Sequence, residues 1–366
     1  MVDKNKLPLL INQELGNRDF TISNKDFDFK NNVLKSFGGN VANFIANKKI
    51  LILTRQSDKE IDSIGPLLIK NDIDYIRINA DSFFGNFEFS IKIPSEGTDN
   101  SSITFKFHGE VYDLNDFNFI WIRHFSEENF FIKHNLESMV KKYLTSEWGE
   151  LFYALLELNF EKTLTPVCKI ISKPLQLIEA KKVGLLIPET IITNSKKDFA
   201  DYFQKYHGKI FAKALKHHSL YKEDGTVLDY YGRSFDSKNL TLLENMEFAP
   251  VIYQNLLDKK NSQEYRLNIF GTNVSSFTYE GIESDDWHLE DISGIKMKKT
   301  SIPDEIKNKV LLLFKNLGIH IGTVDLIRLN NNWYFLEINL GGDWRWLEIA
   351  SNEDLSGDVI DMWASI

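Results

Sequence analysis

The chain has 366 residues, a formal net charge of −9 and 43% hydrophobic residues; this suits two or three compact domains and argues against generic nucleic-acid binding, which requires clustered positive charge. No apolar run approaches the ~20 residues of a membrane span, and the N-terminus lacks the long apolar segment and cleavage site of a secretion signal. The single cysteine, Cys168, excludes an internal disulfide framework, so we expect a cytoplasmic protein.

The N-terminal half begins with residues 1–48, which are rich in Asn, Lys and Phe and are expected to form an irregular extension. After it, the pattern predicts a buried strand at 50–54, an amphipathic helix at 57–70 and a second strand at 74–79. A strand–helix–strand unit implies a parallel sheet.

Three further elements are expected in this half. Residues 81–117 read as a β-excursion, and residues 117–123 as another buried strand. Residues 136–160 carry apolar side chains at i, i+3 and i+4 spacing, which predicts a long helix buried by packing.

A crossing segment at 161–171 leads to the second half. Ser172 is placed to cap a helix that would end at Gly184. Short strands are expected between residues 209 and 257. Polar and apolar residues then alternate at 264–271, which predicts a further strand, and a helix at 303–317 is expected to end at Gly318. The alternation puts Glu264, Arg266 and Asn268 on one strand face.

Residues 322–342 read as a hairpin around three consecutive asparagines, 330–332. If these form the loop and Leu329 faces Trp333, Asp325 lies opposite Glu337, roughly 5 Å away. Asn339 projects from the same face about 7 Å along the strand. Two carboxylates and an amide oxygen suit Mg²⁺.

The alternative to a metal site is a hairpin with an acidic outer face. Two observations favour the metal site. The same alternation places Trp333 and Phe335 on the carboxylate face, which is then not simply solvated. Gly341 and Gly342 follow at once, where a backbone could approach a ligand closely.

Several basic residues could complement this hairpin. Lys213 lies among apolar residues of a predicted strand, where it is either a snorkelling edge residue or the partner of a phosphate. Lys173 begins its helix and is either a surface lysine or an anion ligand. Arg266 could belong to a solvated edge strand. The sequence contains neither a GxxxxGK[ST] nor a GxGxxG motif, and neither a GxSxG elbow nor an HExxH pair.

Taken in order, these pieces resemble the ATP-grasp superfamily over residues 49–350. The nearest likeness is to ATP-grasp ligases that crosslink ribosomal peptides through ω-esters or ω-amides, the microviridin or graspetide type, and within them to the grasp-with-spasm maturases. The resemblance is carried by ILILTRQSDKE, by Trp121-Ile122-Arg123-His124 at the W-x-R-R element, by residues 172–194 and 251–271, and by the VDLIR…FLEIN hairpin.

The resemblance implies an α+β fold with an α/β domain at 49–160, a central subdomain at 161–257 and a C-terminal antiparallel-sheet subdomain at 258–366. It also implies an acyl-phosphate mechanism: ATP phosphorylates an Asp or Glu side chain of a precursor peptide, and a Ser/Thr hydroxyl or Lys amine then attacks. Such an enzyme would use ATP and Mg²⁺, and we expect a homodimer that binds no nucleic acid and no membrane.

The resemblance also assigns roles by matching position. Mg²⁺ would be bound by Asp325, Glu337 and Asn339. ATP phosphates would be bound by Lys173 and Lys213. The adenine ring would be bound by Gln254, Asn255, Leu256 and Leu257. Arg266 would face the γ-phosphate or the acyl phosphate, with Glu264 beside it in the nucleotide site. The cations expected at the acceptor mouth are Arg123, Arg266 and Arg345.

Three departures from the family pattern are visible. Glu264 stands where the family has the Asp of its Asp-x-Arg, His124 replaces the second Arg of W-x-R-R, and residues 340–343 read Leu-Gly-Gly-Asp where P-x-G-Q is usual. Two other functions stay open: an ATP-grasp ligase for a small molecule, of the glutathione-synthetase or glutamate-ligase type, and a nucleotide-binding module without catalysis that recognises a leader peptide. The Asp325, Glu337 and Asn339 set disfavours the module.

Overall fold

The computed structural model describes residues 48–96, 102–164, 171–216, 246–258, 261–280 and 296–365, with short segments at 219–221, 227–229 and 232–235. The expected extension, apart from Lys48, and Cys168 lie outside these residues. In the described part of the chain, no helix is long and apolar enough to cross a membrane.

The N-terminal unit contains the predicted parallel sheet. Its strands β1 (Lys49–Thr54), β2 (Asp74–Asn79) and β6 (Phe119–Ile122) pair in the order β2-β1-β6. Helix α3 (Lys59–Lys70) connects the first two and is capped by Asp58, whose carboxylate accepts from the Ile61 N–H. The β-excursion is also confirmed, as an antiparallel sheet of β3 (Phe87–Lys92), β4 (Ser102–Phe107) and β5 (Glu110–Asp113).

Helix α4 (Ser138–Leu158) forms where a long helix is predicted, but it is buried only in part. Phe152 and Leu155 pack into the aromatic core beneath the small sheet, whereas Met139 is 75% and Tyr143 63% exposed. The expectation of a fully packed helix is therefore wrong for its first half, because the apolar spacing continues beyond the surface that the N-terminal unit offers.

The central unit is an antiparallel sheet of β7 (Thr190–Thr193), β8 (Ile210–Lys213), β11 (Arg233–Phe235) and β12 (Val251–Asn255), in the order β11-β8-β12-β7. Helix α6 (Lys196–Lys205) covers one face, where Phe199 packs with Ile210, Ala212 and Tyr253. Since strand side chains alternate, Lys213 and Gln254 project from the opposite face. A small ribbon pairs β9 (Ser219–Tyr221) with β10 (Val227–Asp229).

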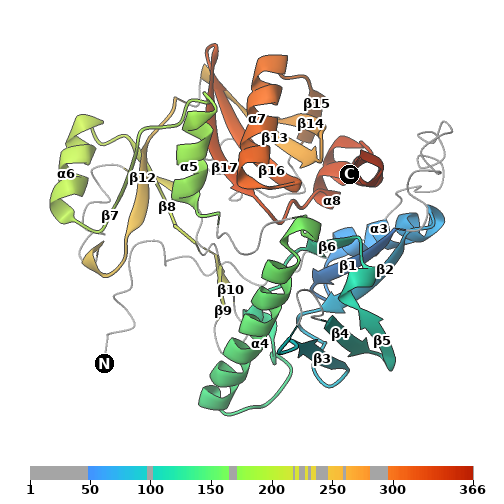
Figure 1. Cartoon of the computed structure of the whole chain (residues 1–366). Coiled ribbons are helices and arrows are strands. Elements are labelled where there is room, and N and C mark those ends of the chain that lie inside the picture. Colours follow the sequence, from blue (N-terminus) through green and yellow to red (C-terminus); the bar gives the residue numbers. More distant parts are fainter. Residues whose placement is uncertain are drawn as a thin grey trace.

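The C-terminal unit is an antiparallel sheet in the order β15-β14-β13-β16-β17. Its strands are β13 (Ser262–Phe270), β14 (Asn273–Glu280), β15 (Lys296–Thr300), β16 (Ile321–Leu329) and β17 (Asn332–Asn339). Helices α5 (Lys173–Lys182) and α7 (Asp304–Leu317) lie side by side over one face (Figure 1). Gly318, at φ 69°, ends α7 as predicted.

Helices α8 (Arg345–Ser351) and α9 (Leu355–Ser365) close the fold against the N-terminal sheet. A shared core joins the two units: Trp121 of β6 stacks on Trp344 with ring centres 6.1 Å apart, and Trp363 of α9 meets Trp121 edge-on. Short 3₁₀ turns complete the described elements at Leu114–Asp116, Glu127–Asn129, Phe160–Lys162 and Met246–Phe248.

Candidate active site

The hairpin of β16 and β17 sets the geometry of the site. Leu329 pairs with Asn332, so the turn contains two residues, Asn330 and Asn331, and the expected pairing of Leu329 with Trp333 is wrong. A bulge between Asp325 and Leu326 then shifts the register. The shift brings Asp325 opposite Glu337, as predicted.

The same bulge changes which side chains share the carboxylate face. Trp333 and Phe335 are buried with Ile338 in the core beneath α5 and α7. Because the extra residue reverses the alternation, Glu337 projects from the opposite face. The expectation that Trp333 and Phe335 share the carboxylate face is therefore wrong.

Two lysines from different elements converge on Glu337. Lys173, at the start of α5, and Lys213, at the end of β8, each place Nζ 3.3 Å from Glu337 Oε2. Lys173 also donates to the Ala214 carbonyl (3.2 Å), and Lys213 to the Leu336 carbonyl (3.3 Å). The side chains of the two lysines are only 11% and 9% exposed. The alternatives of a surface lysine and a snorkelling edge residue therefore do not describe them.

Asp325 is held by an arginine and an amide. Arg266 of β13 directs Nη1 at both carboxylate oxygens, at 3.0 and 3.2 Å, and Asn339 Nδ2 lies 3.0 Å from Oδ2. Arg266 is 4% exposed. Burial opposes its charge, but the Asp325 carboxylate raises the pKa of Arg266 above its ordinary value. Lys173, Lys213 and Arg266 thus bring three cationic side chains to the two carboxylates, and such side chains form charge-assisted hydrogen bonds with phosphate.

The residues expected at adenine lie where β12 ends. Gln254 is 3% exposed, shares its sheet face with Lys213, and donates to Thr190 Oγ1 (3.0 Å). The Asn255 side chain projects from the other face of the sheet, where it accepts from the Glu189 N–H. Only the backbone of Asn255 is therefore left for the predicted adenine site. Leu256 N–H donates to the Lys209 carbonyl (3.0 Å), and Leu257 is 9% exposed. On β13, Glu264 lies on the same face as Arg266.

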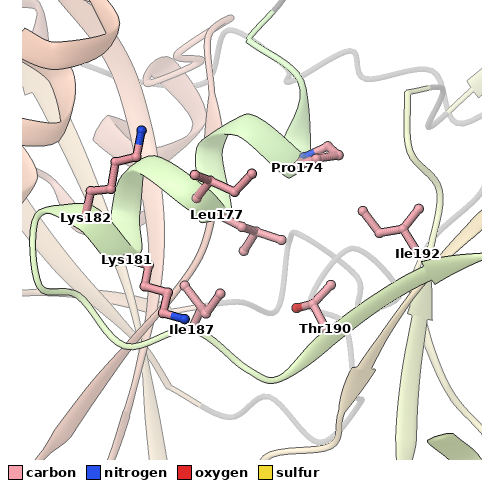
Figure 2. Close-up of a pocket in the computed structure, with 8 residues that line it drawn as sticks. Pro174, Leu177, Lys181, Lys182, Ile187, Thr190 and Ile192 are labelled. Atoms are coloured by element: carbon pink, nitrogen blue, oxygen red, sulfur yellow. The ribbon is translucent and has the colours of Figure 1, made fainter.

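Beside this strand end an open cavity of about 630 Å³ lies between α5 and β7 (Figure 2). Thr190, the partner of Gln254, belongs to its wall. The cavity has no signal in the sequence, since it depends on the distance between a helix and an edge strand. Its lining residues are Pro174, Leu177, Ile178, Lys181, Lys182, Ile187, Thr190 and Ile192.

Arg123 lies in a buried junction between the N-terminal unit and the loop that follows β17. Its guanidinium contacts Asp58 Oδ2 (3.1 Å), Asp343 Oδ1 (2.8 Å) and the Gly341 carbonyl, and its side chain is 0% exposed. Burial opposes the charge, but the nearby carboxylates, Asp58 first, raise the pKa of Arg123. The structure thus places Arg123 as a positioning residue for residues 341–343 rather than at an open mouth.

Arg345 begins α8 and is partly exposed. Its backbone N–H donates to Glu60 Oε1 (3.3 Å). The alternative that Arg345 stacks between Trp344 and Trp346 does not match the structure, because Trp344 is fully buried against Trp121 and the Trp346 ring lies 5.6 Å from the Arg266 guanidinium.

The oxygen ligands of this hairpin determine which metal it could bind. Among the described residues, no group of three or more His, Cys, Asp or Glu could hold a metal ion. Asp325, Glu337 and Asn339 instead supply two carboxylates and one amide, which suits Mg²⁺ because this ion keeps several waters and shares substrate phosphates. The chemistry of these three side chains therefore suits a Mg²⁺ ion that is bound together with phosphate groups.

No protein-family model matches the chain, and no curated protein sequence matches it. Solved structures do. A RiPP-associated ATP-grasp ligase from Chryseobacterium gregarium, solved with ADP and a leader and core peptide, is 23% identical over 87% of this chain and 97% of that one, with a TM-score of 0.73. The macrocyclase MdnC from Microcystis aeruginosa, bound with precursor peptide MdnA, is 20% identical over 86% and 98%, also at 0.73. The ligase PsnB, complexed with minimal precursor, Mg and ADP, is 17% identical over 89% and 97%, at 0.66.

The chain has the ATP-grasp fold. The predicted fold class is confirmed, including its C-terminal antiparallel sheet. Within this ATP-grasp fold, Lys213 comes from β8 of the central unit, whereas Lys173 comes from α5 and Asp325 and Glu337 from the sheet of the C-terminal unit. The candidate site therefore lies where these two units meet.

The sequence analysis missed one pairing at this site. His124 Nε2 lies 2.7 Å from Asp343 Oδ1. Both positions depart from the family pattern, and their common departure was the available signal that they contact each other.

Proposed function

We propose that this chain is an ATP-dependent peptide ligase. It activates Asp or Glu side chains of a ribosomally made precursor peptide as acyl phosphates and joins them to Ser/Thr hydroxyls or Lys amines, releasing ADP and phosphate. The observation that carries this proposal is the convergence of Lys173 and Lys213 on Glu337, opposite Asp325. The similar structures described above, solved with precursor peptides, ADP and Mg, support it.

Three groups of side chains divide the work on the nucleotide. Lys173 and Lys213 bind the phosphates of ATP. When they do so, contacts with phosphate oxygens replace part of their contact with Glu337. Gln254 and the backbone of residues 255–257 meet the adenine, with Glu264 farther along the nucleotide site. Arg266, fixed by Asp325, directs its charge towards the phosphoryl group that is transferred.

Asp325, Glu337 and Asn339 would hold Mg²⁺, which neutralises charge that develops on the transferring phosphoryl group. The protein contributes positioning and fixed charge rather than a covalent intermediate of its own. The partial burial of both carboxylates, each 13% exposed, strengthens these electrostatic interactions relative to water.

The precursor peptide requires a cationic mouth, because an acidic protein repels an acidic peptide elsewhere on its surface. Arg345, at the partly exposed start of α8, is the candidate there, since Arg123 and Arg266 are buried. A cytoplasmic location and a homodimer are further parts of this proposal; light scattering of the purified chain tests the dimer.

Mass spectrometry tests the proposed function directly. The chain is incubated with ATP, Mg²⁺ and the precursor peptide encoded beside its gene. Each ester or amide formed from an acid and a hydroxyl or amine removes one water, so we expect products lighter by whole numbers of water. Ligation of a free amino acid without peptide dehydration would support the small-molecule ligase instead, and ATP binding without ADP formation would support the binding module.

A further inference from the structure

His124 occupies an unusual backbone position at the carboxyl end of β6. The strand ends at Ile122, Arg123 turns into the protein, and His124 adopts φ 46° in the left-handed region. A histidine in this region costs free energy, and such conformations persist where the surrounding structure holds them, often at functional sites.

The His124 ring is fixed on two sides. A Cβ added to Gly341 would lie 3.1 Å from His124 Cε1, so the ring packs directly on the backbone of Gly341. On the other side, Nε2 lies 2.7 Å from Asp343 Oδ1. Gly341 is two residues beyond Asn339, at the turn that follows β17. The ring is thereby fixed against the segment that follows the proposed magnesium ligand Asn339.

Asp343 is held as an anion. It accepts from Arg123 Nη2 (2.8 Å) as well as contacting His124. Burial alone would raise the pKa of Asp343, but the hydrogen bond with His124 and the charges of His124, Arg123 and Arg55 lower it well below its usual range. Asp343 also interacts electrostatically with Arg266, which places it near the phosphoryl-transfer cluster.

The orientation of the imidazole follows from this contact. An ionised carboxylate accepts only, so Nε2 donates its hydrogen to Asp343 and the neutral ring carries its free lone pair on Nδ1. Among the described residues, none forms a hydrogen bond with Nδ1. The His124 side chain is 21% exposed, so the ring is not sealed from solvent.

We propose that the His124–Asp343 pair is the general base for the acceptor step of this ligase. The inference rests on the proposed function and adds a role for two residues that depart from the family pattern. Nδ1 takes the proton of the attacking hydroxyl or amine as the new C–O or C–N bond forms. The C–O bond to phosphate breaks, phosphate leaves with the electron pair, and the proton passes to phosphate or solvent. Asp343 stabilises the imidazolium formed in between.

Two variants separate the base from a structural contact. His124→Asn keeps a hydrogen-bond donor for Asp343 and tolerates the left-handed backbone, but has no basic nitrogen. Glycine adopts φ 46° without strain, so His124→Gly keeps the backbone and leaves room for added imidazole. The matched control is His134→Gln, which alters an exposed histidine that packs on Phe84.

Activation and acceptor attack are measured in the same reaction with ATP, Mg²⁺ and the precursor peptide. Hydroxylamine traps acyl phosphates as hydroxamates without needing a base. We expect His124→Asn to crosslink about 10²–10⁴-fold more slowly, while hydroxamate formation stays close to the wild-type rate. Added imidazole should restore crosslinking to His124→Gly.

The outcomes distinguish this inference from the proposed function. Wild-type crosslinking combined with an unimpaired His124→Asn overturns the inference alone. The inference is also overturned if the His124 variants lose both hydroxamate formation and crosslinking and imidazole does not restore them. That result would indicate that His124 is only a structural contact. A wild-type chain that forms no crosslink overturns the proposed function, and this inference with it.

Discussion

Lys213 and Glu337 come from two different sheets, and their charged atoms lie 3.3 Å apart. Lys173 reaches the same carboxylate oxygen from the start of α5. A carboxylate shared by two nearly buried lysines stabilises the site before a nucleotide arrives, because each charge has a partner. The same arrangement brings together the groups that a phosphate and a divalent cation require.

Removing the charge of Glu337 should abolish turnover while the fold is kept. Glu337→Gln preserves shape but weakens the magnesium site and the pairing with both lysines. We expect ADP formation at saturating Mg²⁺ to fall at least about 10²-fold, as when one electrostatic contact to the transferring group is lost. Circular dichroism should be unchanged.

Glu305→Gln is the matched control for this variant. Its carboxylate is 75% exposed and pairs with Lys309 on the surface of α7, so its removal should leave ADP formation unchanged. Wild-type ATP hydrolysis in a folded Glu337→Gln protein would refute the metal assignment.

Lys213→Ala should weaken ATP binding more than peptide binding, since the ammonium lies at the proposed phosphate position. Charge-assisted contacts of this kind contribute roughly 1.5–3 kcal/mol, so we expect the dissociation constant for ATP to rise about 10- to 150-fold. Isothermal titration calorimetry measures it. Lys299→Ala, which removes an exposed lysine paired with Glu353, is the control. Equal ATP affinity for wild type and Lys213→Ala would exclude this role.

Local pattern predicted the elements of the site well. Three of these elements follow from one dominant local preference each, and the structure contains all three. They are the apolar strand β1, the capped start of α5 and the alternating strand β13. The opposition of Asp325 and Glu337 was also predicted, although for an incomplete reason. The sequence suggested a three-residue loop, whereas a two-residue turn and a bulge together produce the same pairing.

What local pattern could not predict depends on distant contacts. A bulge inserts one residue without an obvious sequence signal and reverses the face of Trp333 and Phe335. The burial of Arg123 depends on Asp58 and Asp343, which are 65 and 220 residues away along the chain. Local spacing contains no information on such separations.

Arg123→Lys should destabilise the junction between the N-terminal unit and the loop after β17. A lysine cannot make the planar, multiple contacts with Asp58, Asp343 and the Gly341 carbonyl, and leaves buried charge poorly paired. We expect a loss of about 3–5 kcal/mol in the free energy of unfolding. Urea denaturation measures it.

Arg328→Lys provides the comparison for that loss. Arg328 is exposed, and its Nε donates to the Asn330 carbonyl (3.2 Å), so the same substitution should cost less than about 1 kcal/mol. Similar losses in the two variants would contradict the assignment of Arg123 as a buried junction residue.

Glu348 carries a carboxyl group that is buried where α8 meets α9. Its Oε1 accepts from the Ser356 N–H (2.5 Å), and Trp344 donates to Ser356 Oγ (3.2 Å). Burial raises the pKa of Glu348 to about 7, although the bonds with Ser356 oppose the rise. The folded state therefore holds a proton that the unfolded chain has already released, and stability falls as pH rises from about 4.5 to about 7.

Glu348→Gln should remove this dependence, because its amide oxygen can still accept from Ser356 and its side chain does not ionise. We expect wild type and variant to be similarly stable near pH 4 and the variant to be more stable by roughly 3 kcal/mol at pH 8. Urea denaturation across this range measures the difference, with Glu150→Gln on an exposed position of α4 as the control. Parallel stability curves for wild type and Glu348→Gln would mean that Glu348 is ionised in the folded protein at neutral pH.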